Sequence, residues 1–292
     1  MSSDAPASAE APHLSAIAGF RLVTADLPRL FGFYRDVLGF AEDGPEQAIR
    51  GDEIRLLGLH GSGRRRMLRL GGQAMAIEQF DPPGRPYPAG GNAASLLFQH
   101  LALVVADMGE AYQRVRGATA ISEGGPQHLP ASSGGVHAYK FRDPDGHPLE
   151  LLHFPGRCQP PAWQGKSTVA GQIGLGIDHS AISVADADAS VAFYSSLGLK
   201  AGERTFNQGA EQECLDNLRD VRVAVAPLRP LEETPHLELL GYRNPRGAAG
   251  PALRPNDVAA TRIAWLGTRT AVLRDPDGHL QQIAPWGLEL PS

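Results

Sequence analysis

The sequence predicts an α+β fold of four β-α-β-β-β units that are arranged in two consecutive pairs. One observation is an internal repeat, because three pairs of residues share the same separation of 160 positions. These pairs are Asp26 and Asp186, Tyr34 and Tyr194, and Glu78 and Glu238. A second observation is the sequence Asp-Pro-Asp-Gly, which occurs at 143–146 and again at 275–278 between apolar runs. Proline and glycine in this arrangement favour a tight turn, so each copy predicts a β-hairpin.

The first unit begins with an apolar-rich strand that we expect over residues 16–24. Asp26 is placed to cap a helix whose apolar residues recur at helical spacing. These residues are Leu27, Leu30, Phe31, Tyr34 and Leu38, and Gly39 is expected to end the helix. Two further strands are expected over 66–70 and 73–80.

A stretch rich in proline and glycine, residues 81–92, separates the first unit from the second. The second unit is expected to contain a strand over 99–105 and a helix over 108–116 that Asp107 caps. A long loop rich in glycine and serine, residues 122–135, should then lead into the first hairpin.

The third unit, from Ile177, repeats the first, but the fourth unit is expected to be incomplete. The separation of 160 residues would place Ala260 opposite His100, whereas the two turn sequences are only 132 residues apart. The difference of 28 residues between these separations corresponds to the helix and the long loop of the second unit. We therefore expect the fourth unit to lack its helix.

The domain organisation that we predict follows the two consecutive pairs. Residues 1–12 should form a disordered tail, and residues 13–156 an N-terminal domain of two units. A linker at 157–172, rich in proline and glycine, should lead to a C-terminal domain at 173–292.

The composition excludes several classes of function. The chain of 292 residues has a formal net charge of −5, and its only basic run, Arg64 to Arg66, is typical of a solvated strand end. Nucleic acid is therefore not an expected partner. No apolar run approaches the roughly 20 residues of a membrane span, and Met1 to Pro12 lacks the features of a signal peptide. With two cysteines, Cys158 and Cys214, the sequence fits a reducing, cytoplasmic protein with a small-molecule partner, and a homodimer stays open.

Several of these motifs resemble the vicinal oxygen chelate superfamily, which includes glyoxalase I, extradiol dioxygenases and bleomycin-resistance proteins. The resemblance depends on the run Phe-Tyr-Arg-Asp-Val-Leu-Gly-Phe at 33–40, on its counterpart at 193–198, and on both hairpins. It extends from His13 to Trp286 and implies that paired units curl into two half-barrels, as in glyoxalase. Because one fold supports many reactions, it implies the architecture more strongly than the chemistry.

The resemblance also implies metal-ligand positions on the first and last strands of each unit. In the N-terminal pair these positions are Gly19, Glu78, His100 and Glu150, and in the C-terminal pair they are His179, Glu238, Ala260 and Gln282. We therefore expect a metal site of His100, Glu150 and Glu78, in which Glu150 and Glu78 also have catalytic roles. A second, weaker site would use His179, Glu238 and His236, the last of which lies on the same strand face as Glu238.

Three protein ligands would leave open positions for two neighbouring oxygens of a substrate. Imidazole and carboxylate ligands suit one divalent ion such as Zn, Mn, Fe, Co or Ni, so the sequence does not select the metal. The expected activity is that of a lyase or isomerase, with an atypical dioxygenase as the next hypothesis.

Other interpretations of the same residues stay open. A metal-free protein that sequesters a small molecule, as bleomycin-resistance relatives do, is the alternative function, because a missing helix would open a cleft. His100 and Glu150 would then be a buried ion pair, and Glu78 a strand-end carboxylate in solvent. His147 and His279, which follow the turn glycines, are expected to be solvated.

Overall fold

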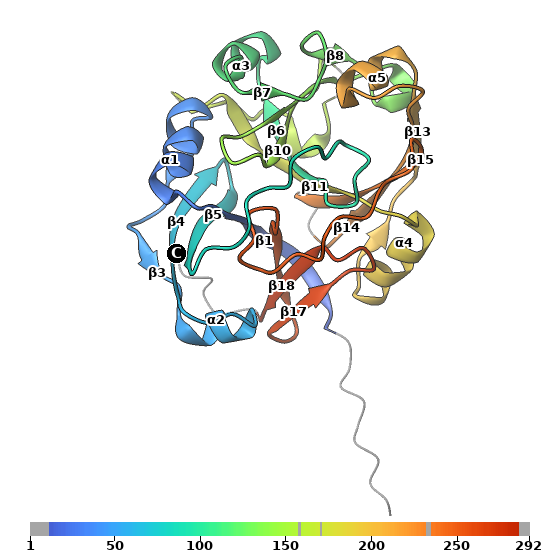
Figure 1. The fold of residues 1–292 in the computed structure, drawn as a ribbon. Coiled ribbons are helices and arrows are strands. Elements are labelled where there is room, and N and C mark those ends of the chain that lie inside the picture. Colours follow the sequence, from blue (N-terminus) through green and yellow to red (C-terminus); the bar gives the residue numbers. More distant parts are fainter. Residues whose placement is uncertain (1–11, 157–158, 170, 232–234, 286–292) are drawn as a thin grey trace, which may run out of the picture.

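The computed structural model describes residues 12–156, 159–169, 171–231 and 235–285. Most of the predicted tail and Cys158 lie outside these ranges. In this part of the chain the strands form an eight-stranded sheet and a ten-stranded sheet, and α1, α3 and α4 lie at the periphery (Figure 1). The α+β fold of four repeated units is therefore confirmed. No helix of the described residues is long and apolar enough to cross a membrane.

The first two units contain the following elements: β1 (Leu14–Val23), α1 (Leu27–Gly32) with a π-helical turn (Phe33–Val37), β2 (Ala41–Glu42), β3 (Gln47–Ala48), α2 (Gly51–Leu56), β4 (Ser62–Leu70), β5 (Gln73–Asp81), β6 (Gln99–Val105), α3 (Met108–Val115), β7 (Thr119–Ala120), β8 (Gln127–His128), a 3₁₀ turn (Ala131–Ser133), β9 (His137–Arg142) and β10 (Pro148–His153). Asp26 and Asp107 cap α1 and α3 as expected, because their carboxylates accept backbone N–H groups of the first turn. The short helix α2 was not anticipated.

The remaining elements follow a short 3₁₀ turn (Pro161–Trp163): β11 (Gly174–Ser183), α4 (Ala187–Ser196), β12 (Lys200–Ala201), β13 (Thr205–Gln208), α5 (Ala210–Asp216), β14 (Arg222–Arg229), β15 (His236–Asn244), β16 (Arg262–Gly267), β17 (Ala271–Arg274) and β18 (Leu280–Ala284). Only residues 268–270 separate β16 from β17, so the fourth unit lacks its helix, as predicted.

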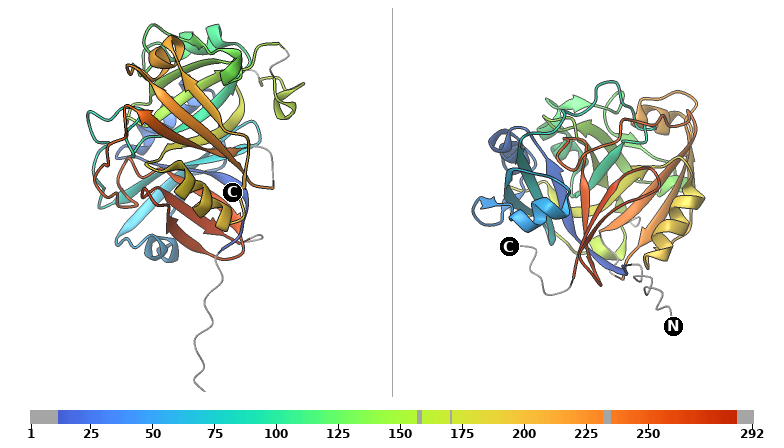
Figure 2. Two further views of the ribbon diagram at one scale, coloured as in Figure 1. Left: turned by 90° about the vertical axis from the view of Figure 1, so that its right-hand side faces the viewer. Right: turned by 60° about the horizontal axis from the view of Figure 1, so that its bottom comes forward.

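The partners within each sheet differ from the predicted consecutive pairs. The first and fourth units share the eight-stranded sheet, in which β1 pairs with β16, and the second and third units share the ten-stranded sheet, in which β6 pairs with β11. Figure 2 shows the first and last parts of the chain, blue and red, together in one half of the molecule. The main apolar core joins both sheets to α1, α3 and α4, through residues such as Phe20, Tyr139 and Trp265. Burial of this shared core is satisfied by either pairing, so the local sequence pattern does not select one.

Strand register also changes two of the predicted correspondences. Gly19 pairs with Ala264, and His179, which is 160 residues after Gly19, pairs with Ala102. Ala264 therefore occupies the place of Ala102, and two residues earlier on the same strands Arg262 occupies the place of His100.

The same comparison applies to the last strands of the first and third units. Arg21 pairs with Ala76, whereas Ala181 pairs with Glu238. Ala76, rather than Glu78, therefore takes the place of Glu238. The separation is 162 residues on this strand and 160 on β1 and β11, because the third unit has two additional residues between its helix and its last strand.

Both Asp-Pro-Asp-Gly turns form the predicted hairpins, with Gly146 and Gly278 at positive φ. The prediction that His147 and His279 are solvated is wrong, since both are buried. His147 contacts Asp143 at 2.8 Å, and the same carboxylate accepts a hydrogen bond from the Tyr34 hydroxyl. The turn histidine thus joins the hairpin to the helix of the neighbouring unit.

Candidate metal centre

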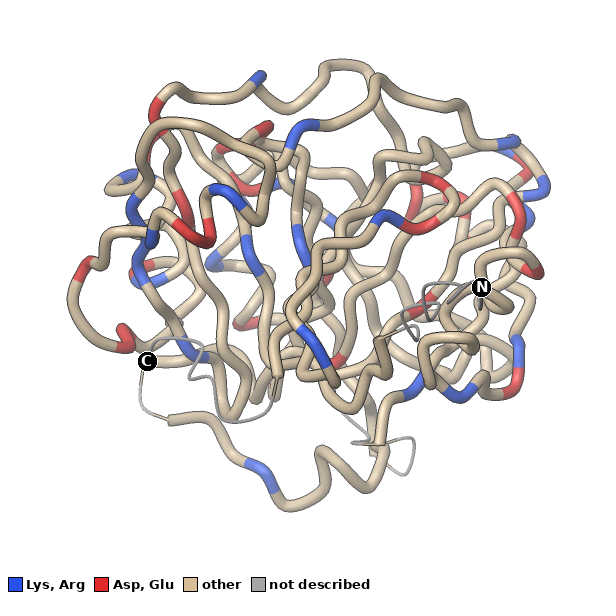
Figure 3. The backbone as a smooth tube through the Cα atoms, turned by 90° about the horizontal axis from the view of Figure 1, so that it is seen from below, with Lys and Arg blue, Asp and Glu red and all other residues tan. Residues whose placement is uncertain are grey.

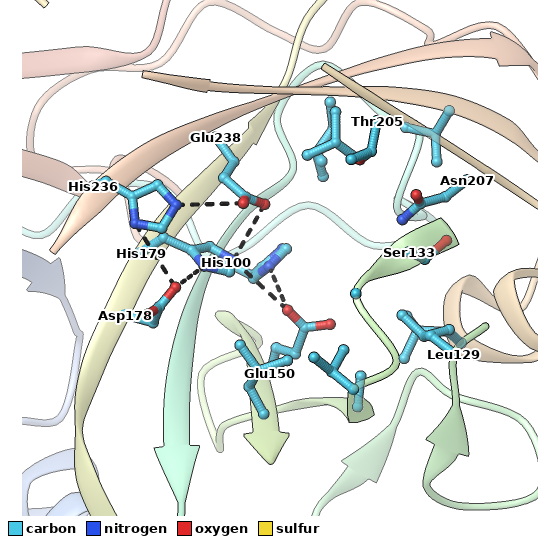
Figure 4. Close-up of a pocket in the computed structure, with 18 of the residues that line it drawn as sticks. His100, Leu129, Ser133, Glu150, Asp178, His179, Thr205, Asn207, His236 and Glu238 are labelled. Carbon is cyan, nitrogen blue, oxygen red and sulfur yellow. Dashed lines mark hydrogen bonds and ion pairs between the residues drawn. The ribbon is translucent and has the colours of Figure 1, made fainter. Parts of the chain in front are cut away.

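A cavity of about 500 Å³ opens on the ten-stranded sheet. Two histidines and two carboxylates come together in it from four adjacent strands, β15, β11, β6 and β10 (Figure 4). They are Glu238, His179, His100 and Glu150. His100 and Glu150 come from the second unit and the other two from the third, so the site lies where the two units meet.

The distances between these side chains fit ligands that face a common point. His100 Nε2 is 3.1 Å from Glu150 Oε2, and His179 Nε2 is 3.8 Å from the same oxygen. His179 Nε2 is also 3.5 Å from Glu238 Oε2. The ligand atoms of His100, Glu150 and His179 all lie within 4.8 Å of one another. One small cation between them could therefore be bound by all three, with Glu238 beside His179.

The site holds more negative than positive charge. Glu150, Glu238 and Asp178 line the cavity, and a further carboxylate, Asp216, is already paired with the ammonium of Lys140 at 2.6 Å. Burial of three carboxylates without a compensating cation is costly. A divalent ion would offset this charge, so the arrangement fits a metal better than an empty polar cluster.

The ionisation of these groups follows from the same charges. Burial alone would raise the pKa of Glu150, but Lys140 and His100 outweigh it and hold this pKa at about 2. Burial likewise opposes ionisation of Glu238, and His179 then lowers its pKa to about 2. The pKa of His179 rises to about 9, because Glu238 and Asp178 outweigh its desolvation. Burial lowers the pKa of His100 below its ordinary value, against the effect of Glu150.

The opposite wall of the cavity is mainly apolar, with Leu129, Val136, Leu152, Val223 and Leu240 among its residues. A second group of buried polar residues lies beside the centre. Asp216 accepts hydrogen bonds from Lys140, Gln212 and Tyr242, and Lys140 lies directly across the strands from Glu150. The helix α5 supplies Gln212 and Asp216 and thereby fixes the position of this ammonium.

Glu78 does not join His100 and Glu150, so the predicted ligand set of the N-terminal pair is corrected. Glu78 lies in the eight-stranded sheet, where it is fully buried rather than solvated and forms an ion pair with Arg262. Arg65, from the run predicted to be solvated, is also buried and lies 3.5 Å from Glu78. Other acidic and basic residues are distributed around the molecule without a large patch of one sign (Figure 3).

The eight-stranded sheet therefore has a counterpart of the metal centre without its ligands. The places of His179, Glu238, His100 and Glu150 are taken by Gly19, Ala76, Arg262 and Gln282. The guanidinium of Arg262 donates hydrogen bonds to Glu78 and to Gln282. An apolar cluster that includes Ile54 and Phe80 packs on this side of the sheet. A fixed cation and apolar side chains thus replace the ligands.

His236, predicted with the weaker site, lies beside Glu238, with 3.4 Å between His236 Nε2 and Glu238 Oε1. The structure thus joins the residues of both predicted sites, except Glu78, in one cluster. A signal for this was present in the sequence, because the ligands missing from one consecutive pair complement those missing from the other. Asp178, Lys140 and Asp216 were missed, since no motif marks them.

A protein of four β-α-β-β-β units, in which one of two sheets gathers two histidines and two glutamates, has the architecture of a vicinal oxygen chelate protein. Residues 13–151 match the family described as the Glyoxalase/Bleomycin resistance protein/Dioxygenase superfamily. The chain belongs to this superfamily. No curated protein matches the sequence.

Solved structures show the same fold over nearly the whole chain. Glyoxalase I from Zea mays is 14% identical with a TM-score of 0.56, and the alignment covers 93% of this chain and 92% of that one. A mutant of the same maize enzyme gives a TM-score of 0.58 at 14% identity, with the same coverage. A putative dioxygenase from Bacillus subtilis is 13% identical with a TM-score of 0.55, over 94% of this chain and 86% of that one. At such low identity these likenesses establish the fold alone.

Proposed function

We propose that the protein is a divalent-metal-dependent enzyme that acts on a small substrate with two neighbouring oxygens, by lyase or isomerase chemistry. The observation that carries this proposal is the group of His100, Glu150, His179 and Glu238 around one point of a cavity. Two imidazoles and two carboxylates match the ligand chemistry of Zn, Mn, Fe, Co or Ni. A bound ion would supply Lewis-acid polarisation of the substrate oxygens.

The protein side chains have separate roles in this proposal. The side chain of Glu238 is 22% exposed and that of Glu150 only 8%, so Glu238 is the more accessible to a substrate. We assign to the Glu238 carboxylate the transfer of a proton from a carbon next to the two oxygens. The apolar wall would hold the hydrocarbon part of the substrate and exclude water. Lys140 would keep Glu150 ionised and hence available as a ligand.

Metal analysis of protein purified without a histidine tag tests the proposal. We expect one divalent ion per chain, retained in His128→Ala, a control at an exposed histidine away from the cluster, and lost in His100→Ala and His179→Ala. Metal in wild type that persists in both ligand variants would place the ion elsewhere. Absence of metal from wild type, even after incubation with Zn²⁺, Mn²⁺ or Co²⁺, would contradict the proposal and favour the metal-free binding protein.

A further inference from the structure

The segment between the second and third units contacts the candidate metal centre. Trp163 lies in this segment, which is not part of any repeat unit, and its side chain is fully buried. Its indole Nε1 donates a hydrogen bond of 2.6 Å to Asp178 Oδ1. The other carboxylate oxygen of Asp178 lies 2.9 Å from His179 Nδ1. A chain of two hydrogen bonds thus links the segment to a metal-ligand residue.

The local strand geometry makes this chain possible. Adjacent residues of a regular strand point to opposite faces, yet Asp178 and His179 contact each other. The pairing of β11 with β6 shifts register between Ile177 and His179, and this irregularity turns Asp178 toward the cavity. The first unit has the same irregularity between Ile17 and Gly19 but no acidic residue there.

The position of the indole is also prepared by the sequence of β11. A Cβ atom at Gly176 would lie 2.8 Å from two ring carbons of Trp163, so only glycine leaves room for the ring. The first unit has Ala16 at the corresponding position, 160 residues earlier, and its sequence contains no tryptophan. Val104 and Leu175 complete the apolar contact with the ring.

The two hydrogen bonds determine how His179 presents its ring. Because the ionised Asp178 only accepts hydrogen bonds, His179 Nδ1 carries a proton and donates it to Asp178. In the metal-bound form, the neutral ring then has its free electron pair on Nε2, the atom that faces Glu150 and Glu238. The Trp163 N–H prevents Asp178 from rotating away. Carboxylates and donors of this kind around a ligand histidine set its tautomer and orientation.

We propose that Trp163 is a positioning residue of the metal centre, which acts through Asp178 to hold His179 ready for metal binding. This rests on the proposed function, since it presumes that His179 is a ligand. Loss of such an outer partner typically lowers metal affinity about 10- to 100-fold, and we expect that effect for Trp163→Phe.

The experiment measures Zn²⁺ affinity of the full chain by competition with a chromophoric chelator, for wild type, Trp163→Phe and Trp265→Phe. Trp265 is the matched control, because it is equally buried and its indole donates a 2.8 Å hydrogen bond to Gln281 away from the centre. Gly176→Ala, which should displace the ring without removing any polar group, is the second test variant. Thermal unfolding of each metal-free protein accompanies the titrations.

We expect weaker Zn²⁺ binding in Trp163→Phe and Gly176→Ala and wild-type affinity in Trp265→Phe, even where all three variants unfold at lower temperature. Unchanged affinity in Trp163→Phe, or an equal loss in Trp265→Phe, would overturn the positioning role and leave the metal centre intact. If Trp163→Phe does not fold, Gly176→Ala decides by the same criteria. Failure of wild type to bind Zn²⁺ at all would instead refute the proposed function, and the positioning role with it.

Discussion

His179 differs from the other histidines of the centre in its surroundings, because it contacts Glu150, Glu238 and Asp178 at once. In the absence of metal these carboxylates favour its protonated form and raise its pKa to about 9. The same contacts hold the pKa of Glu150 and of Glu238 at about 2. The side chains that would bind a divalent ion therefore partly neutralise one another when it is absent.

This mutual neutralisation predicts how the stability of the metal-free protein depends on pH. The pKa of His179 is higher in the folded than in the unfolded chain, so its contribution is complete below about pH 6.5 and is lost as pH rises through about 9. The depressed pKa of Glu150 acts in the opposite direction, with a contribution present above about pH 4.5 and lost as pH falls through about 2.

Urea unfolding in the presence of a chelator measures the effect of His179. Between about pH 6.5 and about pH 9.5 we expect wild type to lose stability relative to His179→Gln by up to about 3 kcal/mol, since each pKa unit corresponds to about 1.4 kcal/mol. A difference between the two proteins that does not change over this range would show that His179 is not protonated among these carboxylates.

At the level of elements, local sequence signals predicted much and long-range partners were missed. The caps at Asp26 and Asp107 and the hairpins at both Asp-Pro-Asp-Gly turns were correct, because they depend on residues close in sequence. The burial of Arg65 was missed, since its partners Glu53 and Glu78 come from α2 and a neighbouring strand. A basic run gives no local indication of such partners.

Arg262 provides a test at this scale, because it holds two elements of different units together. Removal of one partner of a buried ion pair leaves the other charge uncompensated, at a cost of roughly 3–5 kcal/mol. We expect this loss of unfolding free energy in Arg262→Leu, because its guanidinium binds the fully buried Glu78. Arg64→Leu is the control, since Arg64 forms only an exposed pair with Glu46, which is worth about 0–1 kcal/mol.

Metal content distinguishes the role of Arg262 further. Since Arg262 lies in the eight-stranded sheet, folded Arg262→Leu should keep the same metal content as wild type. A variant of full stability would contradict the role of the ion pair, and a folded variant without metal would place the centre in the wrong sheet.

For the whole molecule, the sequence predicted four units but not which units meet. The repeat and the hairpins identify each unit from within, whereas the choice between β6 and β16 as partner of β1 depends on contacts between distant segments. The candidate site inherited this error, because the prediction grouped His100 and Glu150 with Glu78 instead of with His179 and Glu238. Register differences of two residues between repeats were also invisible to a constant spacing.

Two fragments separate the alternatives for unit pairing. Residues 13–156, the predicted N-terminal domain, contain β1 without β16 and β6 without β11, so we expect this fragment to aggregate or to lack cooperative unfolding. Residues 93–250 contain every strand of the ten-stranded sheet and should retain more native secondary structure and Zn²⁺ binding. Circular dichroism, size-exclusion chromatography and metal titration provide the comparison. A folded, metal-binding 13–156 fragment would support consecutive pairing.

The most direct measurement is the anomalous diffraction of crystals grown with Zn²⁺ and recorded on both sides of the zinc absorption edge. We predict one strong anomalous peak in the cavity of the ten-stranded sheet, about 2.0–2.2 Å from a nitrogen of His100 and His179 and from an oxygen of Glu150 and Glu238. A peak beside Glu78, or a zinc-soaked crystal with no peak among these four side chains, would contradict the metal centre.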